Sequence, residues 1–166
     1  MSRQEPPQPT RPDFTPGYGV DRSAVKGMLP WSFVVERMAA SRNYWIATAT
    51  PKGRPHVAPV WGLWLDDAFY FSTDPRSRKG RNLAASPEVV VHLESGDEVV
   101  ILEGTAERIT QPETLVRFAD AYDAKFQFKP DASSPDQGVY RLNIKMAFAW
   151  TEQDFPNNST RWSFGS

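Results

Sequence analysis

The feature that most constrains the fold is a succession of six short apolar segments with the two-residue period of β-strands. Turn residues or short helical stretches separate them, so neighbouring segments can pair as antiparallel strands. The six segments are residues 44–50, 55–65, 68–73, 88–93, 99–109 and 140–150. An open sheet of this size would present unpaired edges. We therefore expect a mainly β fold, a small closed or split six-stranded antiparallel barrel with inserted helices.

Two of the predicted strands carry further information. Pro59 lies inside 55–65, and a proline cannot donate to a ladder, so it indicates a sheet edge, a bulge or a place where another molecule approaches the backbone. Along 140–150 the even-numbered residues from Tyr140 to Trp150 are apolar, whereas Arg141 and the other odd-numbered residues are polar or small. This alternation predicts that the two sets lie on opposite faces along the whole strand.

Three helices are predicted between these strands. Ser32 is expected to cap a helix over 33–40, and Ser77 to cap one over 78–85. Thr110 and Glu113 form a capping-box pattern before a helix that ends near Phe126. Residues 1–30 read as a Pro-rich arm that packs along a partner surface where it is ordered, and residues 31–166 as a single domain.

Composition excludes several classes of function. The 166 residues contain no cysteine, which excludes thiolate nucleophiles, iron–sulfur clusters and thiolate zinc sites. A formal net charge of −1 argues against a dedicated nucleic-acid binder. His56 and His92 lie in different strands without a third ligand at metal spacing, so we expect no metal site. His56 either reaches a bound cofactor or is a hydrogen-bonded barrel residue, and we expect the latter. Without a signal peptide or an apolar run of roughly 20 residues, the chain is expected to be cytoplasmic and not membrane-bound.

Basic residues gather where the predicted helix 78–85 begins. They are Arg76, Arg78, Lys79 and Arg81. A helix N-terminus carries a partial positive charge, so cations there cost about 0.3–1 kcal/mol unless an anion is bound. Hydroxyls of Ser72, Thr73 and Ser77 lie nearby in the sequence. The pattern predicts either a phosphate site or a solvated basic turn.

The stretch 69–83 (FYFSTDPRSRKGRNL), followed by Ser86-Pro87, resembles the phosphate-binding segment of the pyridoxamine 5′-phosphate oxidase-like superfamily. The resemblance implies a split barrel that forms a homodimer, with two cofactor sites across the interface. It assigns phosphate contacts to Ser72, Thr73, Arg78 and Lys79, with Ser77 and Asn82 in the same segment. It also implies that the backbone of Ala58, Pro59, Val60 and Trp61 lines the cofactor ring, and that Arg161 and Trp162 cap the partner's site.

Two differences from the family pattern indicate which branch of the superfamily the sequence resembles. The C-terminal Arg-x-His element with which pyridoxamine phosphate oxidases bind their substrate is missing, and Val99 stands where FMN enzymes place a Gln. Gly53-Arg54-Pro55, Pro59-Val60-Trp61 and Arg81-Asn82-Leu83 are instead similar to the actinobacterial branch that uses the deazaflavin coenzyme F420.

The implied activity is an F420-dependent reductase that transfers hydride to a conjugated or unsaturated small molecule. The alternatives are an FMN-binding oxidase or electron-transfer protein, and a non-catalytic carrier of a flavin or haem-like ligand. No catalytic residue is assigned, since Tyr70, Arg161 and water all remain open as proton donors. Trp61, Trp64 and Trp162 either wall a cleft for a flat substrate or pack in the core.

Overall fold

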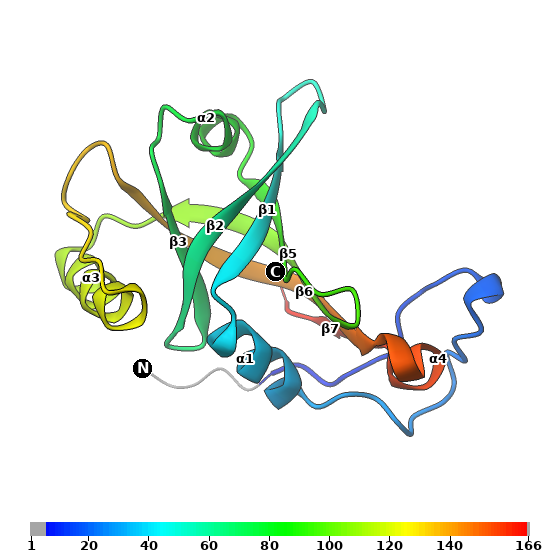
Figure 1. Cartoon of the computed structure of the whole chain (residues 1–166). Coiled ribbons are helices and arrows are strands. Elements are labelled where there is room, and N and C mark those ends of the chain that lie inside the picture. The colour runs from blue at the N-terminus through cyan, green and yellow to red at the C-terminus, as the bar shows by residue number, and fades with distance from the viewer. Residues whose placement is uncertain (1–5, 166) are drawn as a thin grey trace.

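The protein is described by a computed structural model covering residues 6–165, with seven strands and short helices (Figure 1). The strands are β1 (Asn43–Ala49), β2 (Pro55–Leu65), β3 (Ala68–Thr73), β4 (Glu88–His92), β5 (Glu98–Arg108), β6 (Gly138–Thr151) and β7 (Thr160–Ser163). The helices are α1 (Trp31–Ala40), α2 (Arg78–Ala85), α3 (Pro112–Phe126) and α4 (Phe155–Asn158), with 3₁₀ turns η1 (Pro16–Tyr18) and η2 (Glu152–Asp154). None of the helices described is long and apolar enough to cross a membrane.

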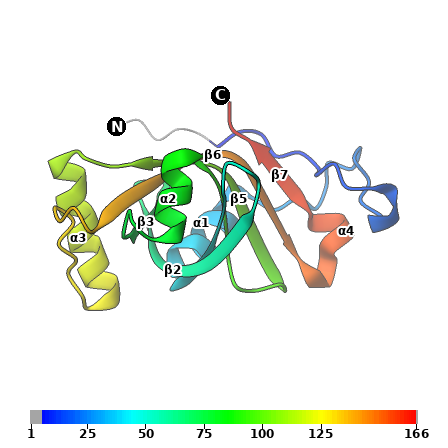
Figure 2. The ribbon, with the colours of Figure 1, turned by 90° about the horizontal axis from the view of Figure 1, so that it is seen from above.

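The sheet closes into the predicted six-stranded antiparallel barrel. Its strand order is β3-β2-β1-β4-β5-β6-β7, and β3 also pairs with β6, which joins the two ends. One edge of β6 pairs with β5. On its other edge, residues 138–141 pair with β3 and residues 146–149 pair with β7. Figure 2 shows α3 at one end of the molecule and α4 with the N-terminal arm at the other.

Aromatic and aliphatic side chains fill the barrel. Tyr44, Ile46, Phe69 and Phe71 are fully buried, and the rings of Tyr44 and Phe69 lie 4.7 Å apart. The Tyr44 hydroxyl lies 2.7 Å from the carbonyl oxygen of Ser41, so the buried polar atom is satisfied. A second cluster, which includes Leu63, Tyr70 and Phe118, lies beneath α3.

A β-bulge in β6 overturns the predicted alternation of that strand. Glu103 pairs with Met146 but Gly104 pairs with Ile144, so Lys145 is an extra residue. The buried residues are therefore even-numbered before the bulge, as Tyr140 and Leu142, and odd-numbered after it, as Ala147 and Ala149. Met146, Phe148 and Trp150 consequently lie on the outer face.

The helix starts were predicted with mixed success. Ser77 caps α2, because its Oγ accepts a hydrogen bond from the backbone N–H of Gly80 at 3.1 Å. The predicted caps at Ser32 and Thr110 are wrong, since Ser32 lies inside α1 and the residue before α3 is Gln111 without a side-chain cap. A proline stands at the start of each of these helices instead. Pro30 precedes α1, and Pro112 is the first residue of α3, where its fixed φ suits the first helical turn.

The arm packs along its own chain, on a strand that the sequence patterns missed. Thr10 pairs with Arg161 of β7 through two backbone hydrogen bonds of 2.7 and 2.8 Å. Arg11 is only 6% exposed and donates to the carbonyl oxygens of Ala24 at 2.9 Å and Ser159 at 3.0 Å. Within the described residues, this surface of the arm is thus occupied by the C-terminal segment.

Candidate functional site

The turn between β3 and α2 is built tightly enough to hold its hydroxyls in place. The Oγ1 atom of Thr73, at the end of β3, lies 3.1 Å from the Oγ of Ser77. Gly80 lies directly beneath the turn, because a Cβ at that position would come within 2.6 Å of the carbonyl oxygens of Asp74 and Pro75. Strand end, turn and first helical turn therefore form one unit.

The four basic residues of this segment divide into two pairs. Arg76 makes a bidentate contact with Asp74, at 3.0 and 3.1 Å, and a 3.0 Å ion pair with Asp136. Its hydrogen bonds hold the pKa of the Asp74 carboxyl below its usual value. Arg81 donates to the carbonyl oxygen of Arg76 at 2.5 Å.

Arg78 and Lys79 have no ion pair or hydrogen bond within the part of the chain that the structure describes. Arg78 is exposed and Lys79 half-buried at the first turn of α2. Two cations at a helix N-terminus, without a carboxylate to compensate them, suit an anion with phosphate chemistry.

Asn82 ties α2 to the barrel. It is 5% exposed, and its Nδ2 donates to the Oγ1 of Thr48 on β1 at 3.0 Å. The amide group predicted to contact the cofactor is thus used within the protein, and it fixes the position of the helix above β1.

His56 belongs to this neighbourhood, and the sequence left open whether it reaches the cofactor or is hydrogen-bonded within the barrel. It lies opposite Thr48 in the β1–β2 register. Burial, Arg78 and Lys79 together hold the pKa of its imidazole below the usual value. Its Nδ1 atom is buried without a hydrogen-bond partner among residues 6–165, so the expectation of a hydrogen-bonded barrel histidine is not met at that atom.

The free edge of β2 explains Pro59. β2 pairs with β3 only over Gly62–Leu65, so the preceding half of the strand has one edge without a neighbour. A proline is tolerated there because no ladder hydrogen bond is lost, which confirms the edge alternative. Pro59 and Trp61 are exposed and Ala58 and Val60 half-buried, so this edge can receive another molecule.

Trp61 stands at one end of this edge as part of an aromatic wall. Its ring is stacked on Phe126 of α3 at 4.8 Å and 4°, and the Arg42 guanidinium lies 4.7 Å from its centroid. Lys125 fastens α3 beside it, donating to the Tyr44 hydroxyl at 3.0 Å and the Gly62 carbonyl oxygen at 3.1 Å. Burial, with a smaller effect of Arg42, lowers the pKa of the Lys125 ammonium.

The C-terminal residues are placed differently from the expectation. Trp162 is 1% exposed and lies edge-on to Trp31 at 5.3 Å in the barrel core. Because Trp61 faces outward, the three tryptophans do not wall a common cleft. Arg161 is half-buried, and its Nε donates to the Thr10 Oγ1 at 3.1 Å, so its side chain holds the arm.

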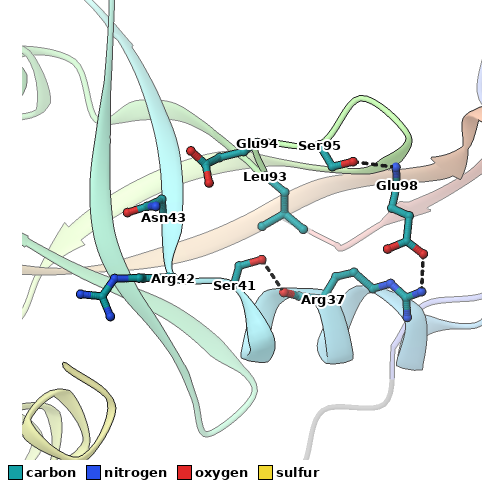
Figure 3. A pocket seen from close by; sticks show the side chains of 8 residues that line it. All are labelled: Arg37, Ser41, Arg42, Asn43, Leu93, Glu94, Ser95 and Glu98. Carbon is teal, nitrogen blue, oxygen red and sulfur yellow. Dashed lines mark hydrogen bonds and ion pairs between the residues drawn. The ribbon is translucent and has the colours of Figure 1, made fainter. Parts of the chain in front are cut away.

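An open depression of about 240 Å³ lies between α1 and the β4–β5 loop, away from the turn between β3 and α2 (Figure 3). Arg37 and Glu98 form an ion pair of 2.6 Å in it. Figure 3 shows the Arg42 guanidinium pointing away from this pair. The described residues contain no cluster of three or more His, Cys, Asp or Glu that could hold a metal ion.

Comparison with known proteins places the fold and site in a family. The family model described as pyridoxamine 5′-phosphate oxidase matches residues 33–151, which include β1–β6 and the turn before α2. The chain belongs to the pyridoxamine 5′-phosphate oxidase family. This confirms the resemblance seen in residues 69–83.

Curated relatives within the pyridoxamine 5′-phosphate oxidase family are similar over about half of the chain. A pyridoxine/pyridoxamine 5′-phosphate oxidase of Gluconobacter oxydans is 40% identical over 82 residues, 48% of this chain and 38% of that protein. Its counterpart in Acidothermus cellulolyticus is 40% identical over 77 residues, 45% of this chain and 34% of that protein. The matches thus span little more than a third of these relatives' length.

Solved structures share the fold of this pyridoxamine 5′-phosphate oxidase family member at low identity. A conserved hypothetical protein of Mycobacterium tuberculosis matches with a TM-score of 0.65 and 24% identity, over 79% of this chain and 90% of that one. A haem-binding protein of Mycobacterium smegmatis gives 0.57 and 24%, over 74% and 55%. An F420 reductase gives 0.52 and 22%, over 68% and 94%.

Proposed function

We propose that the protein is a homodimeric reductase that binds the deazaflavin coenzyme F420 with its phosphate at the turn between β3 and α2. The observation that carries the proposal is the division of the basic residues. Arg76 and Arg81 are engaged within the protein, whereas Arg78 and Lys79 have no ion-pair or hydrogen-bond partner among residues 6–165 and lie beside the Thr73 and Ser77 hydroxyls. These residues fit a phosphate-bearing cofactor.

The choice of F420 over FMN rests on the sequence motifs and on Val99. Val99, at the start of β5, lies opposite Trp150 on β6, so neither side chain offers a flavin ring the carboxamide that a Gln would present. The F420 reductase among the structural neighbours is consistent with this choice at the level of fold. FMN remains the second candidate cofactor, because the curated relatives are pyridoxine/pyridoxamine 5′-phosphate oxidases.

In the proposed mechanism the chain binds and orients the cofactor. The reduced deazaflavin would supply a hydride to an electron-poor, conjugated acceptor. Arg78 and Lys79 would hold the phosphate, and the free edge of β2 from Ala58 to Trp61 would present backbone groups to the ring. Tyr70 is 5% exposed and packs near Phe118, and the Arg161 side chain is bound to Thr10, so water is the proton donor we propose.

A row of mostly apolar and mostly half-buried residues on the outside of the barrel supports the homodimer. Trp45 lies opposite Pro59 on β2 and His92 on β4, and the row continues from His92 to Ile101 and on to Phe148. Directly opposed residues share one face of a sheet, so these side chains form one surface. We propose that a second copy of the chain covers it.

The dimer is tested by sedimentation of the purified protein at micromolar concentration. We expect a mass of twice the 18.7 kDa of the chain. A monomer over the whole concentration range would contradict the proposed assembly.

The reductase is tested by turnover. We expect reduced F420 to be oxidised catalytically with at least one acceptor among enones, quinones and tetrapyrroles, as followed by its absorbance. Arg78→Gln together with Lys79→Gln should abolish this turnover at the same cofactor concentration. If the protein binds cofactor or haem without turnover of any acceptor, it is a carrier, for which the haem-binding neighbour is a precedent of fold.

A further inference from the structure

We propose that His56 is part of the anion site and takes up a proton when the anion binds to Arg78 and Lys79. This inference rests on the proposed function, because it concerns the same site. It adds a regulation by pH that the family resemblance does not imply.

The position of His56 is fixed by the elements that carry the site. His56 lies on β2 opposite Thr48 of β1, and the Thr48 hydroxyl accepts the hydrogen bond of Asn82 from α2. This link holds the first turns of α2, with their two cations, over the same end of β2. The imidazole is half-buried, and its Nδ1 atom is buried without a hydrogen-bond partner in the described structure. A buried polar atom without a partner in the protein is open to a hydrogen bond with a bound ligand or with water.

The charges around His56 have one sign. Arg78 and Lys79 act on it from α2, while the residue opposite it on β1 is the neutral Thr48. Asp74, the acidic residue of the adjoining turn, is held by Arg76. Burial is the main cause of the lowered pKa of His56, and repulsion from the two cations adds to it. The imidazole is therefore neutral in the ligand-free protein near pH 7.

An anion bound between these cations would reverse the sign of the electrostatic effect on the pKa of His56. It would offset the repulsion from Arg78 and Lys79 and attract the imidazolium directly, so the pKa of His56 would rise. A group that gains a proton on binding makes the affinity depend on pH by linkage. We expect affinity to increase as the pH falls, by up to about tenfold per pH unit between the free and bound pKa values of His56.

The experiment is an NMR titration of the imidazole resonances of the full-length protein. The chain has only two histidines, so the His56→Gln variant, which removes one of the two imidazole signals, assigns both. Sulfate is the first probe because its charge stays constant between about pH 5 and about pH 9, so every proton taken up belongs to the protein. F420 and FMN are the second and third probes, with their binding followed in parallel by fluorescence.

We expect sulfate and the bound cofactor each to move the midpoint of His56 upward. Without any anion, Arg78→Gln and Lys79→Gln should each raise the midpoint of His56, because each removes a repelling cation. His56→Gln should bind the non-titrating probe with an affinity independent of pH between about pH 5 and about pH 8.

The outcomes separate this inference from the proposed function. If a cofactor binds by fluorescence and the His56 midpoint does not move, the inference is overturned and the proposed function stands. If sulfate moves the midpoint but neither cofactor binds, the inference stands and the proposed function falls. If no probe binds or moves the midpoint, both are wrong.

Discussion

Replacing Arg78 and Lys79 together with Ala is expected to weaken cofactor binding by a factor of about 100 to 10,000. A hydrogen bond to a charged group contributes about 1.5–3 kcal/mol, and two such contacts correspond to that range of dissociation constants. Each single substitution should cost about tenfold to a hundredfold. The measurement is a fluorescence titration of the ligand-free protein with the cofactor at constant ionic strength.

Arg81→Ala is the matched control, because it removes the same charge from the same helix. Its guanidinium already donates to the Arg76 carbonyl oxygen, so we expect affinity to change by less than about threefold. Arg78→Ala and Lys79→Ala should melt close to the wild type, since neither side chain has a hydrogen bond or ion pair to lose among residues 6–165. Equal losses in Arg81→Ala and Lys79→Ala would mean that only the local net charge matters and would refute a specific site.

Gly104→Ala is expected to destabilise the barrel by about 3 kcal/mol or more, which is the upper part of the range for overpacking. A Cβ on Gly104 would lie 2.0 Å from the carbonyl oxygen of Asn143 and 3.2 Å from the Cα of Ile144. Both neighbours are backbone atoms of the bulged strand β6, which cannot move without disturbing the β5–β6 ladder. The melting temperature should fall by about 6–12 °C, because 1 kcal/mol corresponds to about 2–4 °C in a chain of this size.

Gly96→Ala serves as the control for Gly104→Ala. Gly96 lies in the β4–β5 loop, and a Cβ there would meet no atom within 4 Å. We expect its melting temperature to stay within about 2 °C of the wild type, as is usual for surface substitutions. If Gly104→Ala melted as the control does, the register of β6 around Lys145 would have to be reconsidered.

The local patterns in the sequence predicted the bounds of the barrel strands well where turn residues flank a segment of alternating apolar residues. The bounds of β2 and β3 are those predicted, because short turns close both ends of these strands. The faces of the residues after Lys145 in β6 were predicted wrongly, because one extra residue in a strand exchanges its inner and outer faces. The signal was in the partner strand: Gly104 is the residue that a bulge with close backbone contact requires.

The position of the candidate site in the sequence was predictable, but which of its basic residues are engaged within the protein was not. The basic segment and the Ser77 cap are local features, and a sequence pattern can capture them. Asp136, which engages Arg76, comes from a distant loop, and the proximity of His56 to Arg78 depends on how α2 packs over β1. β7 was missed because four residues are too few to establish a period. For the same reason the sequence could not show that Trp162, in this strand, lies in the core.

The central claim is tested most directly by titrating the ligand-free protein with F420 and, separately, with FMN. We predict that F420 saturates one site per chain and binds at least about tenfold more tightly than FMN, a difference of about 1.4 kcal/mol. The Arg78→Ala, Lys79→Ala double variant should lose this binding. Saturable FMN binding with no response to F420 would contradict the proposed cofactor, and F420 binding that survives the double substitution would contradict the site.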